Sequence, residues 1–196
     1  MTWNTLTEQV AALWASRLWM LLAAVWVVMW LGMKKAKKRE AWYQRMEHGL
    51  LVIAGFYLLS AQGPDWSWLN ERVLPGVPAV WLTGLAVTAL GVAVAIWARL
   101  SLGSNWSGTV TLKANHELVR TGLYRWIRHP IYTGILVGMI GTAMIRGYLR
   151  GWIGIGFVLL AFYLKARREE SFLREEFGAG FDEHAKHTGM FLPKLT

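Results

Sequence analysis

Five apolar runs divide the chain, and they constrain its fold more than any other feature of the sequence. The runs cover residues 18–33, 49–61, 77–97, 131–145 and 151–164. A helix needs about 20 predominantly apolar residues to cross a bilayer, and it must satisfy its backbone polar groups internally. We therefore predict an all-α integral membrane protein with about five transmembrane segments. The fourth and fifth runs are short and closely linked, so we expect them to form a tight helical hairpin.

The composition agrees with a membrane protein. Hydrophobic residues make up 55% of the 196 residues and charged residues only 17%, whereas soluble domains carry about a quarter charged residues. We attribute the net charge of +9 to cytoplasmic loops and anionic headgroups rather than to nucleic acid. The first run lacks the flanks of a cleavable signal peptide. We expect one membrane domain over residues 1–196, with an N-terminal transmembrane half (1–94) and a catalytic half (95–193).

Lysine and arginine gather in alternate loops, and their distribution predicts the orientation of the chain. Six basic residues lie in the loop at 34–45, and the stretches at 99–128 and 165–194 hold five and six more. Because positive charge favours the cytoplasm, we expect the N-terminus outside and the C-terminus in the cytoplasm, across the inner membrane in a bacterium. Arg146 and Arg150, at the tip of the predicted hairpin, are the exception to this pattern.

A polar cluster directly before the fourth apolar run is the strongest indication of function. The segment "RHPIYTG", residues 128–134, puts an arginine, a histidine and a proline directly before apolar residues. The end of the fifth run carries three cations followed by two acids within residues 165–170. Charged groups at a membrane boundary either snorkel to the headgroups or serve a function. We expect the stretches 99–130 and 165–196 to face each other on the cytoplasmic side as a polar pocket.

Several common chemistries are absent from the sequence. No dinucleotide-binding glycine fingerprint follows a strand, and neither a P-loop nor a nucleophile elbow occurs. The chain has no cysteine, which excludes thiolate metal sites and cysteine nucleophiles. His184 and His187 beside Glu183 have a spacing that can bind a metal, but we interpret them as solvated residues of the tail and expect no metal site.

A set of short motifs in the C-terminal half carries a family resemblance. The motifs are, in order, "HELV" at 116–119, "GLYRWIRHPIYTG" at 122–134, "EE" at 169–170, "FG" at 177–178 and "LP" at 192–193. Together they resemble the isoprenylcysteine carboxyl methyltransferase family, which is similar in turn to the membrane phospholipid N-methyltransferases. The combination is specific, and it covers about residues 95–193. The resemblance implies an S-adenosylmethionine-dependent methyltransferase with the cofactor in a cytosolic pocket formed by the loop before the hairpin and the tail.

The resemblance also implies which residues bind the cofactor. The matching positions are His116, Glu117, Leu118, Val119, Tyr124, His129, Pro130, Ile131, Tyr132 and Glu169. We interpret Glu169 as an acceptor for the ribose hydroxyls or the ammonium group, and His129 as a donor to the methionyl carboxylate. We expect the backbone of a strand at 116–119 to bind the adenine edge, while Tyr124 and Tyr132 stack or hydrogen-bond.

The sequence departs from the family at one position near the substrate. Members with a prenylcysteine substrate carry an arginine four residues before the glutamate matched by Glu169, and this arginine meets the substrate carboxylate. Lys165 stands there instead, which keeps the charge but loses the bidentate fork, and Arg167 or Arg168 could substitute. We predict direct methyl transfer to a lipophilic acceptor that enters from the bilayer. A carboxylate of the isoprenylcysteine type is the first candidate, and the amine of a phospholipid is the alternative.

The residues alone leave two other functional classes possible. A nicotinamide-dependent membrane reductase shares this general architecture but normally needs a larger membrane body. A non-enzymatic membrane adaptor would leave the polar cluster without a role. Thermal stabilisation of the purified protein by S-adenosylhomocysteine or by NADPH distinguishes the methyltransferase from the reductase, and the absence of both effects favours the adaptor.

Overall fold

The computed structural model describes residues 3–30, 36–39, 41–60, 68–103, 111–113 and 118–194. Within this part of the chain the structure is dominated by α-helices, which confirms the predicted fold class. The α-helices are α1 (Trp3–Trp30), α2 (Trp42–Ser60), α3 (Pro78–Leu102), α4 (Pro130–Arg146), α5 (Leu149–Phe177) and α6 (Ala179–His187), with a 3-10 helix η2 (Gly122–Arg125) before α4. The strands β1 (Ala36–Arg39) and β2 (Thr111–Lys113) pair antiparallel, and this small ribbon was not predicted.

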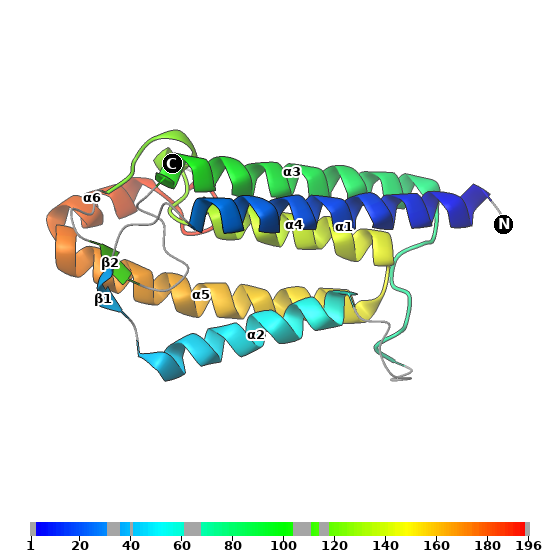
Figure 1. Cartoon of the computed structure of the whole chain (residues 1–196), viewed down its shortest axis with the longest axis horizontal. Coiled ribbons are helices and arrows are strands. Elements are labelled where there is room, and N and C mark those ends of the chain that lie inside the picture. Colours follow the sequence, from blue (N-terminus) through cyan, green and yellow to red (C-terminus); the bar gives the residue numbers. More distant parts are fainter. Residues whose placement is uncertain are drawn as a thin grey trace.

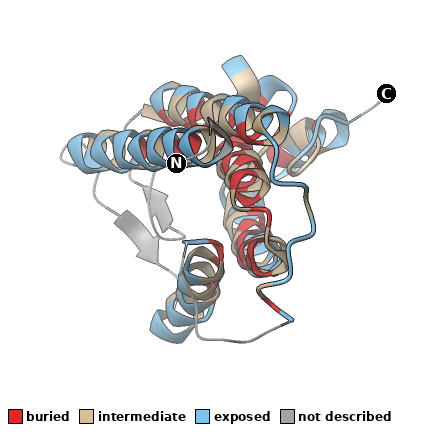
Figure 2. Ribbon diagram, turned by 90° about the vertical axis from the view of Figure 1, so that its right-hand side faces the viewer, coloured by how far each residue is buried: buried red, intermediate tan, exposed pale blue. Residues whose placement is uncertain are grey.

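The five long helices correspond to the five apolar runs. Among the described residues, α1 from Thr5 onward, α3 and α5 are long and apolar enough to cross a membrane by length and composition, and α4 is a shorter apolar helix. Figure 1 shows α1, α3 and α4 side by side in one group, with α2 and α5 in a second group beneath them. The buried residues gather along the inner helices of the bundle, as the red segments in Figure 2 show.

Glycine contacts hold α3 against α4 along most of their length. A Cβ atom added at Gly134 would lie 2.5 Å from the backbone nitrogen of Ala95, and one added at Gly91 would lie 2.5 Å from the carbonyl oxygen of Gly134. Gly141 and Gly84 approach each other in the same way. Small residues allow this backbone contact in membranes, where apolar burial alone gives little association. The α3–α4 pair is therefore packed backbone to backbone.

A second glycine contact joins α2 to α5. A Cβ at Gly55 would lie 2.6 Å from the carbonyl oxygen of Gly154, and the reverse substitution would be equally close. The hairpin of α4 and α5 is present, with a two-residue connection in which Gly147 has a φ of 75°. Its helices approach closely at the turn, where a Cβ at Gly151 would lie 3.3 Å from Ala143. Most glycines of the hairpin thus pack against α3 and α2 rather than against each other.

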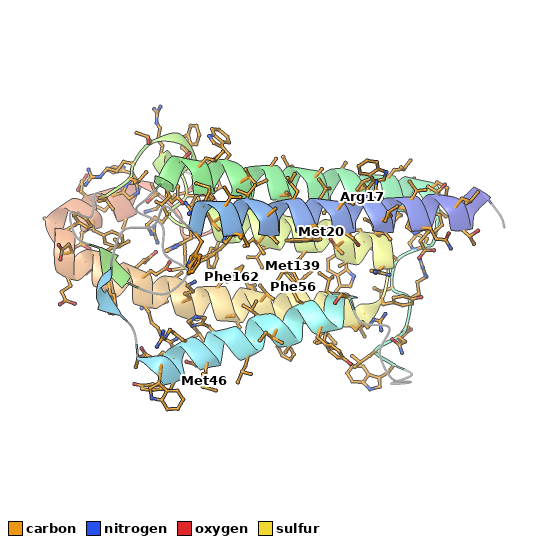
Figure 3. All side chains as sticks on the ribbon, in the orientation of Figure 1. Arg17, Met20, Met46, Phe56, Met139 and Phe162 are labelled. Atoms are coloured by element: carbon orange, nitrogen blue, oxygen red, sulfur yellow. The ribbon has the colours of Figure 1, made fainter. Side chains whose placement is uncertain are left out.

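Apolar side chains fill the layer between the two groups of helices. Met139, Phe56 and Phe162 lie between the groups in Figure 3. The largest buried cluster includes Met139 and Phe162 together with residues of α2 and α5, and Trp19 of α1 contacts the ring of Phe56 edge-on at 5.5 Å. The Nε1 of Trp19 donates a hydrogen bond to Thr142 Oγ1 (3.0 Å). The layer is therefore held by side chains, in contrast to the two glycine contacts.

The polar tail begins as a continuation of the last apolar helix. α5 runs without a break to Phe177 and ends at Gly178, whose φ of 50° requires a glycine-like conformation. This end agrees with the sequence, in which charged residues alternate at helical spacing up to that glycine. α6 follows, and the chain then returns to the start of α4. The acids near the end of α5 are thereby brought to the same end of the bundle as His129.

Replacing Gly91 by alanine is expected to destabilise the protein by about 1–3 kcal/mol, because the new methyl group would meet the backbone of α4 in a contact that cannot relax without moving a helix. Gly156→Ala is the matched control, since it lies within α5 and nothing lies within 4 Å of an added Cβ. Thermal unfolding in detergent should show a lower Tm for Gly91→Ala only. Equal Tm values for both variants would contradict the tight α3–α4 contact.

Candidate functional site

The candidate site lies where the start of α4 meets the end of α5 and the C-terminal tail. Pro130 is the first residue of α4, and His129 precedes it with φ −124° and ψ 58°, outside the helical region. A residue before proline disfavours the helical conformation, so the helix begins here. The backbone nitrogens of Arg128 and His129 donate to the carbonyls of Gly189 (2.9 Å) and Met190 (3.0 Å). The two polar stretches therefore face each other, as the sequence predicts.

The imidazole of His129 lies between two carboxylates from α5. Its Nδ1 is 3.4 Å from Glu169 Oε2, and its Nε2 is 3.2 Å from Glu170 Oε1. Each ring nitrogen must carry a hydrogen to donate to these acceptors. Burial disfavours the charged imidazolium, but the hydrogen bonds and charges of the two glutamates outweigh it and raise the pKa of His129. The environment therefore favours His129 as a cation.

Arg128 extends this line of alternating charges into the tail. Its Nε donates to Glu170 Oε1 at 2.7 Å, and both side chains are largely buried. Its Nη1 donates to the carbonyl oxygens of Thr188 and Ala185, at the end of α6. Arg128 and Glu170 belonged to the predicted polar cluster but not to the predicted catalytic or cofactor-binding residues. The signal for them was the pair of consecutive bases at 128–129 opposite the consecutive acids at 169–170.

Tyr132 connects the charged line to a group of stacked rings. Its hydroxyl donates to Glu169 Oε1 at 2.8 Å. Its ring stacks on Phe162 with centroids 4.5 Å apart and lies parallel to the His129 ring at 5.4 Å. The ammonium nitrogen of Lys165 lies 5.5 Å from the centre of the Tyr132 ring, within cation–π range. One face of α5 thus presents Lys165 and Glu169, four residues apart, to the same tyrosine.

The tail closes one side of this aromatic group. The ring of Phe191 contacts the rings of His129 and Tyr132 edge-on, with centroid distances of 6.2 and 6.4 Å. Thr133 Oγ1 donates to the carbonyl oxygen of Phe191 at 2.7 Å and so fixes this part of the tail on α4. Phe191 was not among the predicted site residues. Only the late "LP" motif beside it indicated that the tail returns to the site.

The two arginines proposed as substitutes for a family arginine lie on other sides of α5. Arg168 donates to the carbonyl oxygen of Gln44 (3.2 Å) and pairs with the Glu47 carboxylate, both on α2. Arg167 is exposed. Neither guanidinium is brought into the group formed by His129 and Tyr132, whereas Lys165 is. Of the three predicted catalytic cations, Lys165 is the one beside the site.

The remaining predicted cofactor residues lie partly around the same end of the bundle. Tyr124, Pro130 and Ile131 are buried, and Val119 packs against the largest hydrophobic cluster. Burial raises the pKa of Tyr124, the charge of Glu169 raises it further, and Arg99 opposes this. Leu118 and Val119 are partly buried and lie outside any strand, which corrects the expected strand at 116–119. His116 and Glu117 lie outside the described residues.

The sequence comparisons agree with the motifs. Residues 83–175 match the isoprenylcysteine carboxyl methyltransferase family. A probable protein-S-isoprenylcysteine O-methyltransferase of Oryza sativa subsp. indica is 28% identical over 149 residues, which are 71% of this chain and 78% of the relative. The Saccharomyces cerevisiae protein-S-isoprenylcysteine O-methyltransferase is 33% identical over 113 residues, covering 56% of this chain and 47% of the yeast protein.

A solved structure supports the fold as well. The eukaryotic intramembrane Ras methyltransferase ICMT matches with a TM-score of 0.52 and 25% identity over 76% of this chain. The match covers 52% of that protein, so this chain spans about half its length, as it does for the yeast relative. The membrane-spanning helices and this neighbour identify an integral membrane protein. Residues 83–175, just under half of the chain, are thus similar to the isoprenylcysteine carboxyl methyltransferase family, and this match together with the named relatives indicates a methyltransferase.

Proposed function

We propose that the protein is an S-adenosylmethionine-dependent membrane methyltransferase that acts on a carboxylate of a lipophilic, isoprenylcysteine-type acceptor on the cytoplasmic side. The observation that carries the proposal is the charged and aromatic group of His129, Tyr132, Lys165 and Glu169 at the boundary of an apolar bundle. This group lies within the matched region, and relatives over that region are named for methylation of isoprenylcysteine.

The chemistry of these residues fits the cofactor. When bound, S-adenosylmethionine supplies an electrophilic methyl group on a positively charged sulfur. Aromatic ring faces suit such a cation, and a carboxylate suits the cofactor's ammonium group or ribose hydroxyls. Glu169 accepts a hydrogen bond from Tyr132, whose ring stacks on Phe162. Glu169 is partly accessible, with a side chain 22% exposed, and its two oxygens keep acceptor capacity beyond the bonds from His129 and Tyr132.

The cationic side of the site would hold the cofactor's own carboxylate. The surrounding acids favour the charged form of His129, and His129 would donate to this carboxylate once one of its ring N–H groups leaves the glutamate that it contacts in this structure. Tyr124 and Tyr132 would contribute rings or hydroxyls, the buried Pro130 and Ile131 would shape the wall, and the backbone of Leu118 and Val119 would contact the adenine edge. His116 and Glu117 complete the proposed set from the family motif.

The protonation of the described site favours a carboxylate acceptor over an amine. A protonated amine must lose its proton before it can attack, and a general base must receive that proton. The two glutamates favour the form of His129 with hydrogens on both nitrogens, and Glu169 and Glu170 accept hydrogen bonds within the charged line. A carboxylate is already ionised at neutral pH. Its oxygen would form the bond to the methyl carbon as the bond to sulfur breaks, so no proton would move.

The reaction itself can be tested with two acceptors. The protein in lipid nanodiscs would be incubated with methyl-labelled cofactor and either farnesylcysteine or phosphatidylethanolamine. We expect label on farnesylcysteine that alkali releases, because a methyl ester hydrolyses and an N-methyl group does not. Alkali-stable label on the phospholipid, with none on farnesylcysteine, would instead establish the amine alternative.

Glu169→Gln and His129→Ala are expected to weaken cofactor binding, measured on protein that far-UV circular dichroism shows to be folded. Loss of a hydrogen bond between a protein group and a charged partner costs on the order of 1.5–3 kcal/mol, which is roughly tenfold or more in affinity. Calorimetric titration with S-adenosylhomocysteine measures the change. Glu183→Gln on the exposed face of α6 serves as the control and should bind as the unmodified protein does. Unchanged affinity in both site variants would remove these residues from the cofactor site.

Lys165 distinguishes the two acceptor classes through one substitution. With a carboxylate acceptor, Lys165→Ala should lower kcat/KM while cofactor affinity stays constant, and Lys165→Arg should retain or raise activity through a two-point contact. With an amine acceptor, removing the cation should be neutral or mildly activating, because like charges repel. The assay compares kcat/KM for both acceptors with the Kd of the cofactor. If both variants turn over every acceptor normally, Lys165 has no part in the site.

A further inference from the structure

Two arginines, Arg72 and Arg150, contact the ring of Tyr148 at the end of the bundle opposite the candidate site, and Arg146 precedes it by two residues. Arg146 ends α4 and Arg150 is the second residue of α5, so they flank the Gly147–Tyr148 connection. Arg72, in the segment before α3, forms a β-bridge with Tyr148. Arg146 and Arg150 are the basic residues that depart from the predicted distribution of charge, and neither the family motifs nor the proposed reaction uses any of the three arginines.

Arg72 already has binding partners within the protein. It forms a salt bridge with Glu8 of α1 at 3.1 Å, and its guanidinium carbon lies 5.4 Å from the centre of the Tyr148 ring. Its Nη1 would be only 2.9 Å from a Cβ added at either Gly76 or Gly147. Arg72 therefore passes between two glycines, and its charge is neutralised. It fixes the ring on which the next arginine lies.

Arg150 differs from Arg72 because it is a buried cation without a carboxylate partner among the described residues. Only 8% of the residue is exposed, and its guanidinium carbon lies 5.0 Å from the centre of the Tyr148 ring. Within the described ranges, no carboxylate lies within 4 Å of Arg150 or Arg146, and the nearby Glu71 is exposed. A buried charge is costly unless an opposite charge or hydrogen bonds compensate it. The ring orients the guanidinium, but it supplies no anion.

The depth of Arg150 indicates which anion is available. Glu169 follows Arg150 by nineteen positions on one continuous helix, which at 1.5 Å per residue is roughly 28 Å. The hydrocarbon core of a bilayer is about 30 Å thick. With the charged end of α5 at one membrane face, Arg150 lies at the level of the phosphate groups of the other face. The first amides of α5 cannot serve an anion, because Leu149 and Arg150 already donate to the carbonyls of Glu71 and Leu69.

We propose that Arg150, with Arg146 across the hairpin turn, binds a phosphate group at this membrane face. A guanidinium offers two parallel donors that match the oxygens of a phosphate. Tyr148 and Arg72 hold the Arg150 side chain in place before the ligand arrives, which reduces the entropy lost on binding. The depth favours a phospholipid headgroup over free phosphate as the source. The site is independent of the proposed reaction.

The test measures stabilisation of the full chain in neutral detergent by three additives. Dioctanoyl phosphatidylglycerol carries a lipid phosphate, dioctanoylglycerol has the same chains without phosphate, and inorganic phosphate has no chains. We expect phosphatidylglycerol to raise the Tm, with dioctanoylglycerol ineffective. Arg150→Gln should reduce the apparent lipid affinity about tenfold, and Arg150→Lys should lie between. Equal stabilisation by inorganic phosphate at the same concentration would identify free phosphate as the source.

Arg17→Gln is the matched control, because Arg17 also lies over an aromatic ring, 4.8 Å from the centre of Trp14, but is exposed on α1. It should respond to phosphatidylglycerol as the unmodified protein does. The same lipid response in Arg150→Gln and Arg17→Gln would overturn the proposal. Should Arg150→Gln fail to fold, photocrosslinking of the unmodified protein with a photoreactive phosphatidylglycerol decides it. Crosslinks should concentrate in residues 146–152, and an even spread over the helices would reject the site.

Discussion

A buried histidine with a carboxylate at each ring nitrogen is the interaction on which the functional end of the molecule depends. His129 lies at the start of α4, Glu169 and Glu170 lie near the end of α5, and Arg128 joins the same line to the tail. Charges removed from water are tolerated only when each meets an opposite charge in good geometry. The alternation of base and acid satisfies this condition over four residues. It also determines where three separate parts of the chain meet.

This line of charges bears on chemistry as well as on assembly. Its members alternate in charge and are joined by hydrogen bonds, and the two glutamates favour the cationic form of His129. An enzyme that transfers a methyl group to a carboxylate needs orientation and exclusion of water more than it needs proton transfer. The rings of Tyr132, Phe162 and Phe191 around the line supply an apolar and rigid setting of this kind.

The sequence predicted the helices and the meeting of the polar stretches because those features rest on local signals. Apolar length indicates a span, a proline starts α4, and Gly178 ends α5. The spacing of Lys165 and Glu169 correctly predicted a shared helix face. The partners of the glycines were not predictable, because Gly154 carries no mark that it meets Gly55 of α2 rather than α4. Likewise nothing local distinguishes Arg168, which pairs with α2, from Lys165, and the family motifs gave no sign of the β1–β2 ribbon.

The two glycine contacts have a mechanical consequence. One joins α3 to α4 and the other joins α2 to α5, so no helix takes part in both. Backbone contact makes each pair stiff, whereas the layer between the pairs consists of side chains that can change rotamer without breaking a backbone contact. The pairs are tied at one end by the short turn at Gly147 and at the other by His129 and the acids of α5. The apolar layer in the middle of the molecule is therefore the part that deforms most easily. The distances between the charged groups at the end of the bundle stay constant.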